Sequence, residues 1–399
     1  MLVKLIPDLA QARLSRSQGR FLTEAPPILN PVDLEALECA VRLREQTPGA
    51  EVVTLTLAEP SVEGALKKLA ALGADNCYLV DQAGVAVEDP ACRARVLAAA
   101  LQKIGSVDQV VAGSGSVTGG GGAVGYAIAE VLGCAARPSI SASSDWPASP
   151  SLSTVAPGQF PPRPTPITAI ARAAKVPLTR WELADLGLAA SAVGPEAAAV
   201  QVRRRYLPDP ESAPSRLATS SGAGELPPAE WSGLLVVGAS DGARLTPGSA
   251  GTVALAAEVA QLLGARVTVM LVGAGAAARA IRYGADVVRT CASSDGLLEA
   301  VAGLVTADHP EAVLWDDTPA ARVMAARLSL RWQTGCLLGV SHVALDAESR
   351  QLVATQTLYE GRVAQEVVIR RRPQFITIAA AAHAAPVPDA ARPGTVTPL

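Results

Sequence analysis

The sequence has few of the residues on which catalysis, metal binding and disulfide formation usually depend. Only 3 of its 399 residues are histidine, aromatic residues make up 3%, and the six cysteines are scattered without a CxxC pair. A nucleophile needs an oriented base, and a metal site needs ligands at characteristic spacings. We therefore expect no catalytic residues and no metal site, with the cysteines serving as small buried hydrophobic residues.

The chain also lacks a strong excess of charge and any long apolar run. A net charge of -3 and a pI near 5.8 give no basic footprint for nucleic acid. The apolar stretches 255–264 and 267–278 are too short or too rich in glycine and alanine to span a bilayer. Because the start MLVKLIPDLAQARL also lacks the basic and apolar regions of a secretory signal, we expect a cytoplasmic protein.

The residues that are present favour an α/β fold. Short runs of β-branched residues alternate with amphipathic helical stretches, and a chain of this length usually needs more than one core. The order of features recurs: VVTLTL (52–57) leads to LGAD (72–75), and VTVMLV (267–272) leads to YGAD (283–286). The pattern predicts two tandem Rossmann-like domains with mainly parallel sheets.

Proline- and serine-rich stretches suggest where these domains end. We expect residues 1–207 and 231–384 to form the two domains, with a linker at 208–230 and a disordered tail at 385–399. Residues 136–166 are also rich in serine and proline, which disfavour helix and central strand alike. The sequence predicts a loop or arm there.

Several segments resemble the electron transfer flavoprotein family. In the first half these are VKLIPDLAQAR (3–13), NPVDLEALECAVRLRE (30–45) and ALKKLAALGAD (65–75), which are similar to the family's β subunit. In the second half LLVVGAS (234–240), RVMAARL (322–328) and RPQFITI (372–378) resemble the N-terminal domain of its α subunit. The resemblance implies a fusion of the two subunits, each half with the Rossmann-like fold of the adenine nucleotide α-hydrolases.

The resemblance also implies where the flavin lies. In the family, FAD is carried mainly by a C-terminal domain of the α subunit, whereas here RPQFITI is followed by alanines and a tail. We therefore expect the FAD domain to be supplied by another chain. The chain would then be an electron-transfer subunit, with a flavin dehydrogenase or a separate FAD-domain subunit as its redox partner, in a homo- or hetero-oligomer.

A glycine-rich segment, GSGSVTGGGGAVGYAIAEVLG (113–133), reads as a strand end, a loop and a helix start. Such a loop aims backbone N–H groups and a helix dipole at a phosphate. The spacing matches neither GxGxxG nor a P-loop, so the motif alone is weak. In the resembling β subunits this loop holds AMP or a second FAD.

The nucleotide-binding positions carried over by the resemblance lie on the first strand, two turns and this loop. They are Leu2, Asn30, Pro31, Val32, Asp33, Ala58, Thr118, Gly119, Gly120, Gly121, Gly122, Ala123, Val124 and Gly125. The loop's acidic, Gln and Thr side chains of the family are replaced here, and Glu59 stands where the family has glycine. Either the backbone alone holds AMP, or the site is vestigial.

Ile167 and the pair Asp316 and Asp317 each have a functional and a structural interpretation. Ile167 aligns with a leucine that anchors a dehydrogenase partner in the family, although a single exposed aliphatic residue is ordinary. Asp316 and Asp317 follow a strand-like run, where the sequence favours capping of the next helix over acid–base work.

Three functions remain open from the sequence, and it leaves undecided whether the chain is an enzyme. The first is an electron carrier or scaffold, which needs proximity to a redox partner more than catalytic side chains. The second is a non-redox structural or regulatory module with a vestigial or retained AMP site. The third is an adenine-nucleotide enzyme, against which the missing SGGxDS-type loop argues.

Overall fold

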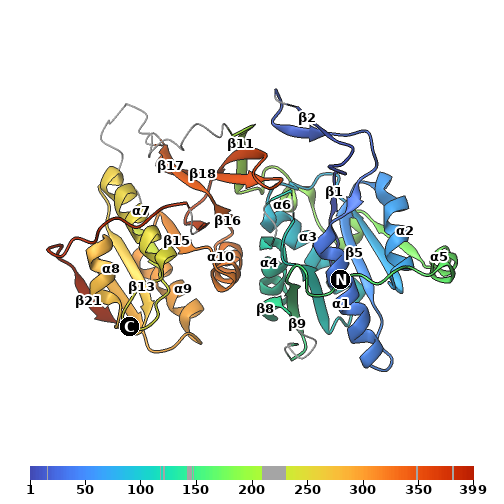
Figure 1. Ribbon diagram of the computed structural model, residues 1–399, viewed down its shortest axis with the longest axis horizontal. Coiled ribbons are helices and arrows are strands. Elements are labelled where there is room, and N and C mark those ends of the chain that lie inside the picture. The colour runs from blue at the N-terminus through green and yellow to red at the C-terminus, as the bar shows by residue number, and fades with distance from the viewer. Residues whose placement is uncertain are drawn as a thin grey trace. The chain divides into compact units, whose positions relative to one another are not determined.

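The computed structural model describes residues 1–15, 17–116, 118–119, 122–141, 146, 148–208, 231–346, 349–379 and 382–399. Two compact units divide the chain (Figure 1). Unit 1 contains residues 1–198, 205–207 and 358–363, and unit 2 contains residues 199–204, 208–357 and 364–399. The linker expected at 208–230 lies almost wholly outside the described residues.

Unit 1 is built around parallel strands flanked by helices. Its main helices are α1 (Pro31–Gln46), α2 (Glu63–Ala71), α3 (Pro90–Ile104), α4 (Ala123–Leu132), α5 (Ile167–Ala173) and α6 (Ala190–Val193). Its main strands are β5 (Val53–Ala58), β6 (Asn76–Asp81), β7 (Gln109–Gly113), β8 (Ala135–Ile140), β9 (Ser151–Val155) and β10 (Leu178–Trp181). Shorter pairs are β1 (Leu5–Ile6) with β4 (Ile28–Leu29), and β2 (Arg13–Ser15) with β3 (Arg20–Leu22).

The first residues of the chain join two three-stranded parallel sheets of unit 1. One sheet has the order β10-β6-β5 and the other β7-β9-β8. Between them, the N–H of Leu2 donates to the carbonyl of Val111 at 2.8 Å, and the N–H of Val3 donates to the carbonyl of Leu55 at 3.0 Å. The first residues therefore take the place of a central strand.

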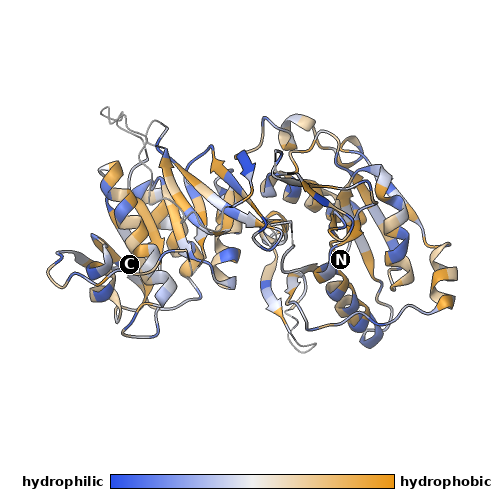
Figure 2. Cartoon of the chain, turned by 45° about the horizontal axis from the view of Figure 1, so that its top comes forward, coloured by the Kyte–Doolittle hydropathy of each residue, from blue (hydrophilic) through white to orange (hydrophobic). Residues whose placement is uncertain are grey.

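Unit 2 contains one fully parallel sheet of seven strands. Its helices are α7 (Pro247–Leu263), α8 (Ala277–Tyr283), α9 (Leu297–Asp308) and α10 (Pro319–Arg331). The strands of this sheet are β12 (Leu234–Val237), β13 (Val267–Val272), β14 (Val287–Cys291), β15 (Ala312–Asp316), β16 (Cys336–Val340), β20 (Gln374–Ile378) and β21 (Thr395–Pro398). Apolar residues gather on these strands (Figure 2), and their core includes Val236, Leu314 and Ile376 at 0% exposure.

The two sheets share one strand order, as the recurring sequence features predict. Unit 2 reads β16-β20-β15-β12-β13-β14-β21, and unit 1 reads β8-β9-β7, the first residues, then β5-β6-β10. The GAD aspartates do the same work in both: Asp75 accepts from the N–H of Val52 at 2.8 Å, and Asp286 accepts from that of Val267 at 2.9 Å. The α/β fold with mainly parallel sheets is confirmed.

Helix ends follow the local sequence. Asp89 caps α3 by accepting from two backbone N–H groups, and Thr246 and Thr318 cap α7 and α10. At the other end, α4 and α7 stop at left-handed glycines, Gly133 and Gly264. Among the described residues, we find no helix with the length and hydropathy to cross a membrane.

Two segments differ from the expectation of irregular structure. The stretch 136–166 was expected to be a loop or arm, yet it contains β9, which is the central strand of its sheet. The tail 385–399 was expected to be disordered, yet β21 pairs in parallel with β14. In both cases pairing with distant strands offsets the weak local preference.

A second sheet alters the expected boundary of the first domain. Strand β11 (Val200–Tyr206) pairs with β19 (Val363–Ile369), which lies beside β18 (Gln351–Leu358) and β17 (His342–Asp346). Residues 199–204 therefore group with unit 2, although the sequence placed them in the domain 1–207. The partner strand is more than 150 residues away, so no local pattern indicates this pairing.

Candidate functional site

A small pocket lies in unit 1 at the carboxyl ends of the parallel strands. It is lined by the first residues of the chain, the ends of β5 and β7, the start of α1, one face of α3 and the start of α4. Ligands of doubly wound sheets bind at this edge, where the crossover loops converge. The pocket is therefore where this fold places a binding site.

Asp33 organises one wall of the pocket. Its two carboxylate oxygens accept from the N–H of Lys4 at 2.7 Å and from the N–H of Gly113 at 3.1 Å. Nearby, the Asn30 side chain donates to the carbonyl of Gly115 at 2.9 Å. Asp33 and Asn30 are 6% and 1% exposed, so they tie α1 to the glycine loop from inside the fold.

Burial shifts the ionisation of this carboxylate. Removal from water raises the pKa of Asp33 to about 6, and the hydrogen bonds from Lys4, Asn30 and Gly113 offset only part of that rise. Gly113 has to be glycine, because a Cβ there would lie 2.5 Å from a carboxylate oxygen of Asp33. The pocket wall thus depends on one close backbone approach.

Two cations line the same pocket. Lys4 donates through Nζ to the hydroxyl of Thr118 at 2.6 Å, and burial followed by the charge of Arg93 lowers the pKa of Lys4 to about 8. Burial also lowers the pKa of Arg93, whose Nε atom is buried and has no hydrogen-bond partner among the described residues. An unpaired guanidinium donor and a half-buried ammonium favour an anion.

The start of α4 adds the backbone groups that the glycine-rich sequence predicts. Gly122 is the N-cap, with φ of 99°, a conformation that L side chains rarely adopt. Gly122, Val124 and Gly125 all line the pocket. A helix of ten residues therefore points its N-terminal end, with its partial positive charge, at the space beside the two cations.

The size of the pocket limits its occupant. Its cavity measures about 110 Å³, against roughly 300–1,000 Å³ for complete small-molecule sites. The donors fit a phosphate group. A whole nucleotide would require the walls to move apart.

The structure brings together part of the predicted set of site residues. Leu2, Asn30, Asp33, Gly122, Val124 and Gly125 line the pocket. The others in the described part of the chain lie outside its lining: Pro31, Val32, Ala58, Thr118, Gly119 and Ala123. Gly120 and Gly121 lie outside the described residues.

Glu59, which stands where the family has glycine, would repel an anion if its carboxylate faced the pocket, but it does not line the pocket. Its side chain accepts from Gln82 at 3.4 Å, is exposed, and is absent from the lining of the pocket. Conversely, sequence reasoning missed Lys4 and Arg93. Lys4 lies two residues from Leu2, which was predicted; Arg93 carries no signal, because only the packing of α3 brings it here.

In unit 2, Asp316 and Asp317 lie at the end of β15, and the contacts of Asp317 are structural. Thr318 caps α10, so the prediction that Asp316 or Asp317 caps that helix is wrong. Asp317 instead accepts two hydrogen bonds from the guanidinium of Arg322, at 2.8 and 2.6 Å, and a third from Thr377 at 2.6 Å. With these donors in place, Asp317 is engaged within the unit.

Ile167, the predicted partner-binding residue, is the most exposed part of a small apolar surface. It begins α5 (Figure 1) and is 85% exposed, and Ile170 one turn later is 57% exposed. Residues three apart on a helix share a face, so both side chains point the same way.

Comparison with known proteins identifies the family. The electron transfer flavoprotein domain matches residues 19–143 and 234–399. The caffeyl-CoA reductase-Etf complex subunit CarD of Acetobacterium woodii is 29% identical over 227 residues, covering 51% of this chain and 86% of CarD.

Further relatives match the first half. Protein FixA of Azorhizobium caulinodans is 38% identical over 136 residues, 33% of this chain and 48% of FixA. The electron transfer flavoprotein subunit beta of Thermoanaerobacterium thermosaccharolyticum is 34% identical over 133 residues, 33% of this chain and 50% of that subunit. The chain thus spans about half the length of these two. Because the domain matches both halves, the chain belongs to the electron transfer flavoprotein family.

Proposed function

We propose that this chain is a subunit of a flavin-dependent electron-transfer system, supplying the scaffold while another chain supplies the FAD domain. The observation that carries the proposal is the family match in both halves, at residues 19–143 and 234–399. FAD, when bound, exchanges electrons with partner proteins. The residues of this chain would position it and keep water from it.

The names of relatives support a multi-subunit assembly. CarD is named as a subunit of a caffeyl-CoA reductase-Etf complex, and a protein of Anaerotignum propionicum, 31% identical over 133 residues, as an acryloyl-CoA reductase electron transfer subunit. We accordingly place this chain in a cytoplasmic complex with a redox partner. A linker within 208–230 would join residues 205–207 of unit 1 to the main part of unit 2.

A second function, nucleotide binding, is favoured by the pocket of unit 1. Lys4 and Arg93 supply positive charge, Asn30 fixes the glycine loop, and the α4 N-terminus supplies backbone donors. These groups suit the phosphate of AMP or of a flavin adenine dinucleotide. The backbone and two cations would compensate for the family side chains that the loop lacks.

In this proposal, Ile167 and Ile170 form the docking site for the redox partner. Replacing both, as Ile167→Ser with Ile170→Ser, should weaken partner binding about tenfold or more, because apolar anchors in a partner's pocket carry much of the binding energy. Co-purification with tagged partner from the source cells, followed by titration calorimetry, measures the effect. Thermal stability should stay unchanged, since neither side chain is buried.

The flavin assignment is tested by an absorbance spectrum and by mass spectrometry of molecules released on denaturation. The chain alone should release no stoichiometric flavin, and co-expression with an FAD-domain protein should restore the flavin bands. Stoichiometric FAD in the isolated chain would overturn the proposal that another chain holds it. Flavin-free complexes with unrelated enzymes would support the non-redox module, and turnover of ATP or AMP would support the adenine-nucleotide enzyme.

A further inference from the structure

Two buried polar atoms of the small unit 1 pocket have no partner, and they are of opposite kinds. Asn30 is 1% exposed, and its Oδ1 atom accepts no hydrogen bond in the part of the chain that the structure describes. The Nε atom of Arg93 is also buried and donates none there. Both residues line the pocket. Because most buried polar atoms in proteins have a partner, this pair indicates a ligand that both donates and accepts hydrogen bonds.

The side-chain amide of Asn30 has only one suitable orientation. Its Nδ2 atom donates to the carbonyl of Gly115 at 2.9 Å, and a carbonyl oxygen can only accept. If the amide turned over, two oxygen atoms would face each other at that distance. The atom left for a ligand is therefore the acceptor Oδ1, which needs an O–H or N–H group.

Asp33 adds a negative charge beside the same space. It lines the pocket, and its two oxygens accept from the backbone N–H groups of Lys4 and Gly113. Its pKa is about 6, so the carboxylate is largely ionised at neutral pH. It repels an anion that has no proton to share, whereas a hydroxyl of the anion could be turned toward it.

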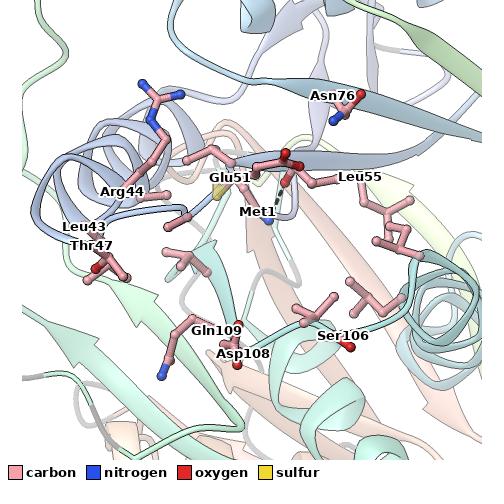
Figure 3. A pocket seen from close by; sticks show the side chains of 18 of the residues that line it. Met1, Leu43, Arg44, Thr47, Glu51, Leu55, Asn76, Ser106, Asp108 and Gln109 are labelled. Carbon is pink, nitrogen blue, oxygen red and sulfur yellow. Dashed lines mark hydrogen bonds between the residues drawn. The ribbon is translucent and has the colours of Figure 1, made fainter.

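The larger hollow of unit 1 lacks this combination. Its volume is about 600 Å³, and it lies at the amino ends of the strands, beside the starts of β5 and β7 (Figure 3). Arg44, which lines it, donates to both carboxylate oxygens of Asp75, at 2.9 and 2.8 Å. None of its described lining residues has a buried side-chain atom without a partner. The unpaired atoms therefore distinguish the smaller pocket.

We propose that the small pocket selects a tetrahedral anion that keeps one hydroxyl, such as hydrogen phosphate, over an anion of the same charge that has none. The hydroxyl donates to Asn30 Oδ1, and the other oxygens accept from Arg93, from Lys4 and from the start of α4. The inference rests on the anion site proposed above and names the property that its ligand needs. Free hydrogen phosphate supplies the hydroxyl itself, whereas AMP would supply it from the ribose.

The test compares three dianions of similar size with the full chain, by titration calorimetry at about pH 7.5. Hydrogen phosphate carries one hydroxyl, whereas sulfate and monofluorophosphate carry none. Hydrogen phosphate should bind about tenfold more tightly than either, because only it can donate to Asn30 Oδ1. Equal affinities would overturn the inference and leave the anion site in place. If none of the three bound, the inference and the proposed anion site would both be wrong.

Variants of Asn30 show whether this residue makes the selection. Asn30→Leu removes the acceptor and should lower the preference for hydrogen phosphate over sulfate at least about threefold. Asn30→Asp keeps an oxygen acceptor but adds negative charge, so both affinities should fall while the preference remains. Arg93→Met is the matched control and should weaken all three anions alike. An unchanged preference in an Asn30→Leu protein that is folded by circular dichroism would overturn the assignment to Asn30.

AMP and its dideoxy analogue, which lacks both ribose hydroxyls, distinguish the two sources of the hydroxyl. If the dideoxy compound binds about tenfold more weakly than AMP, the ribose supplies the hydroxyl. If both bind no better than sulfate while hydrogen phosphate binds more tightly, the ligand is free phosphate. Equal binding of both, well above that of sulfate, would overturn the requirement for a hydroxyl.

Discussion

Close contact between Asp33 and Gly113 holds the glycine loop in place. In a Gly113→Ala variant the new Cβ would lie 2.5 Å from Asp33 Oδ1 and 3.0 Å from the backbone of Val32. The carboxylate must move and give up hydrogen bonds to two buried N–H groups, which should cost about 2–4 kcal/mol. Urea unfolding measures the loss.

Gly115 gives a matched control two residues away. A Cβ at Gly115 would meet nothing within 4 Å, and its φ lies outside the left-handed region. Gly115→Ala should therefore change the free energy of unfolding by less than about 1 kcal/mol. A similar loss in both variants would contradict the role assigned to the Asp33 contact.

The charges of the unit 1 pocket predict how anion binding changes with pH. Sulfate is a suitable probe, because it is a small tetrahedral anion like a phosphate group and keeps its charge between about pH 5 and 9. Its affinity should fall as pH rises through about 6, where Asp33 becomes negative, and again through about 8, where Lys4 becomes neutral. Each step should weaken binding about three- to tenfold by calorimetry.

Variants separate the two steps. Lys4→Met should remove the step near pH 8. Arg93→Met should weaken binding on both sides of each step, since it removes a positive charge and the unpaired Nε donor from the pocket. If the affinity for sulfate rose with pH, or if neither Lys4→Met nor Arg93→Met changed it, sulfate would bind at another site.

At the scale of elements, the sequence predicts those helices, strands and turns that have a local sequence pattern. It does not predict strands that form only by pairing with distant parts of the chain. Alternating strands and helices, the GAD turns and the glycine-rich start of α4 all follow from local pattern. The sequence analysis did not predict strand β9, because residues such as Ser153 and Thr154 are common in loops. Both residues are buried in the structure. The buried hydroxyl of Thr154 is hydrogen-bonded to the hydroxyl of Tyr126 at 3.0 Å and accepts from the N–H of Ser139 at 2.9 Å.

The residues of the candidate site also fall into those that the sequence predicts and those that it does not. Asn30, Asp33 and Gly122 could be predicted because they belong to motifs. Arg93 could not, because its helical surroundings in α3 carry no sign of the pocket that packing creates beside it.

Strand β21 predicts a role for the C-terminal residues. All of β21 is exposed, so its contribution comes mainly from pairing with the edge of β14. Removing residues 394–399 should lower the stability of unit 2 by about 1–2 kcal/mol and promote self-association through the bare edge. Chemical unfolding and light scattering measure both effects. Val396→Ser keeps the backbone pairing and should change neither; equal association in both variants would exclude edge pairing as the cause.

At the scale of the whole molecule, the duplicated architecture gives each unit its own core. The unit 1 core includes Leu79 and the unit 2 core includes Leu314, both at 0% exposure. Each leucine should contribute about 2–5 kcal/mol through its buried methyl groups. Leu79→Ala should therefore lower one unfolding transition, and Leu314→Ala the other.

Tryptophan fluorescence can separate these transitions, because Trp315 lies in the unit 2 sheet at 1% exposure and Trp181 lies in β10 of unit 1. Sulfate should raise the transition lowered by Leu79→Ala and leave the other unchanged, since its pocket belongs to unit 1. If both variants lowered one common transition by the same amount, the units would fold as a single cooperative body. Ligand binding in unit 1 would then stabilise unit 2 as well, and the two halves would respond together when a redox partner or nucleotide binds.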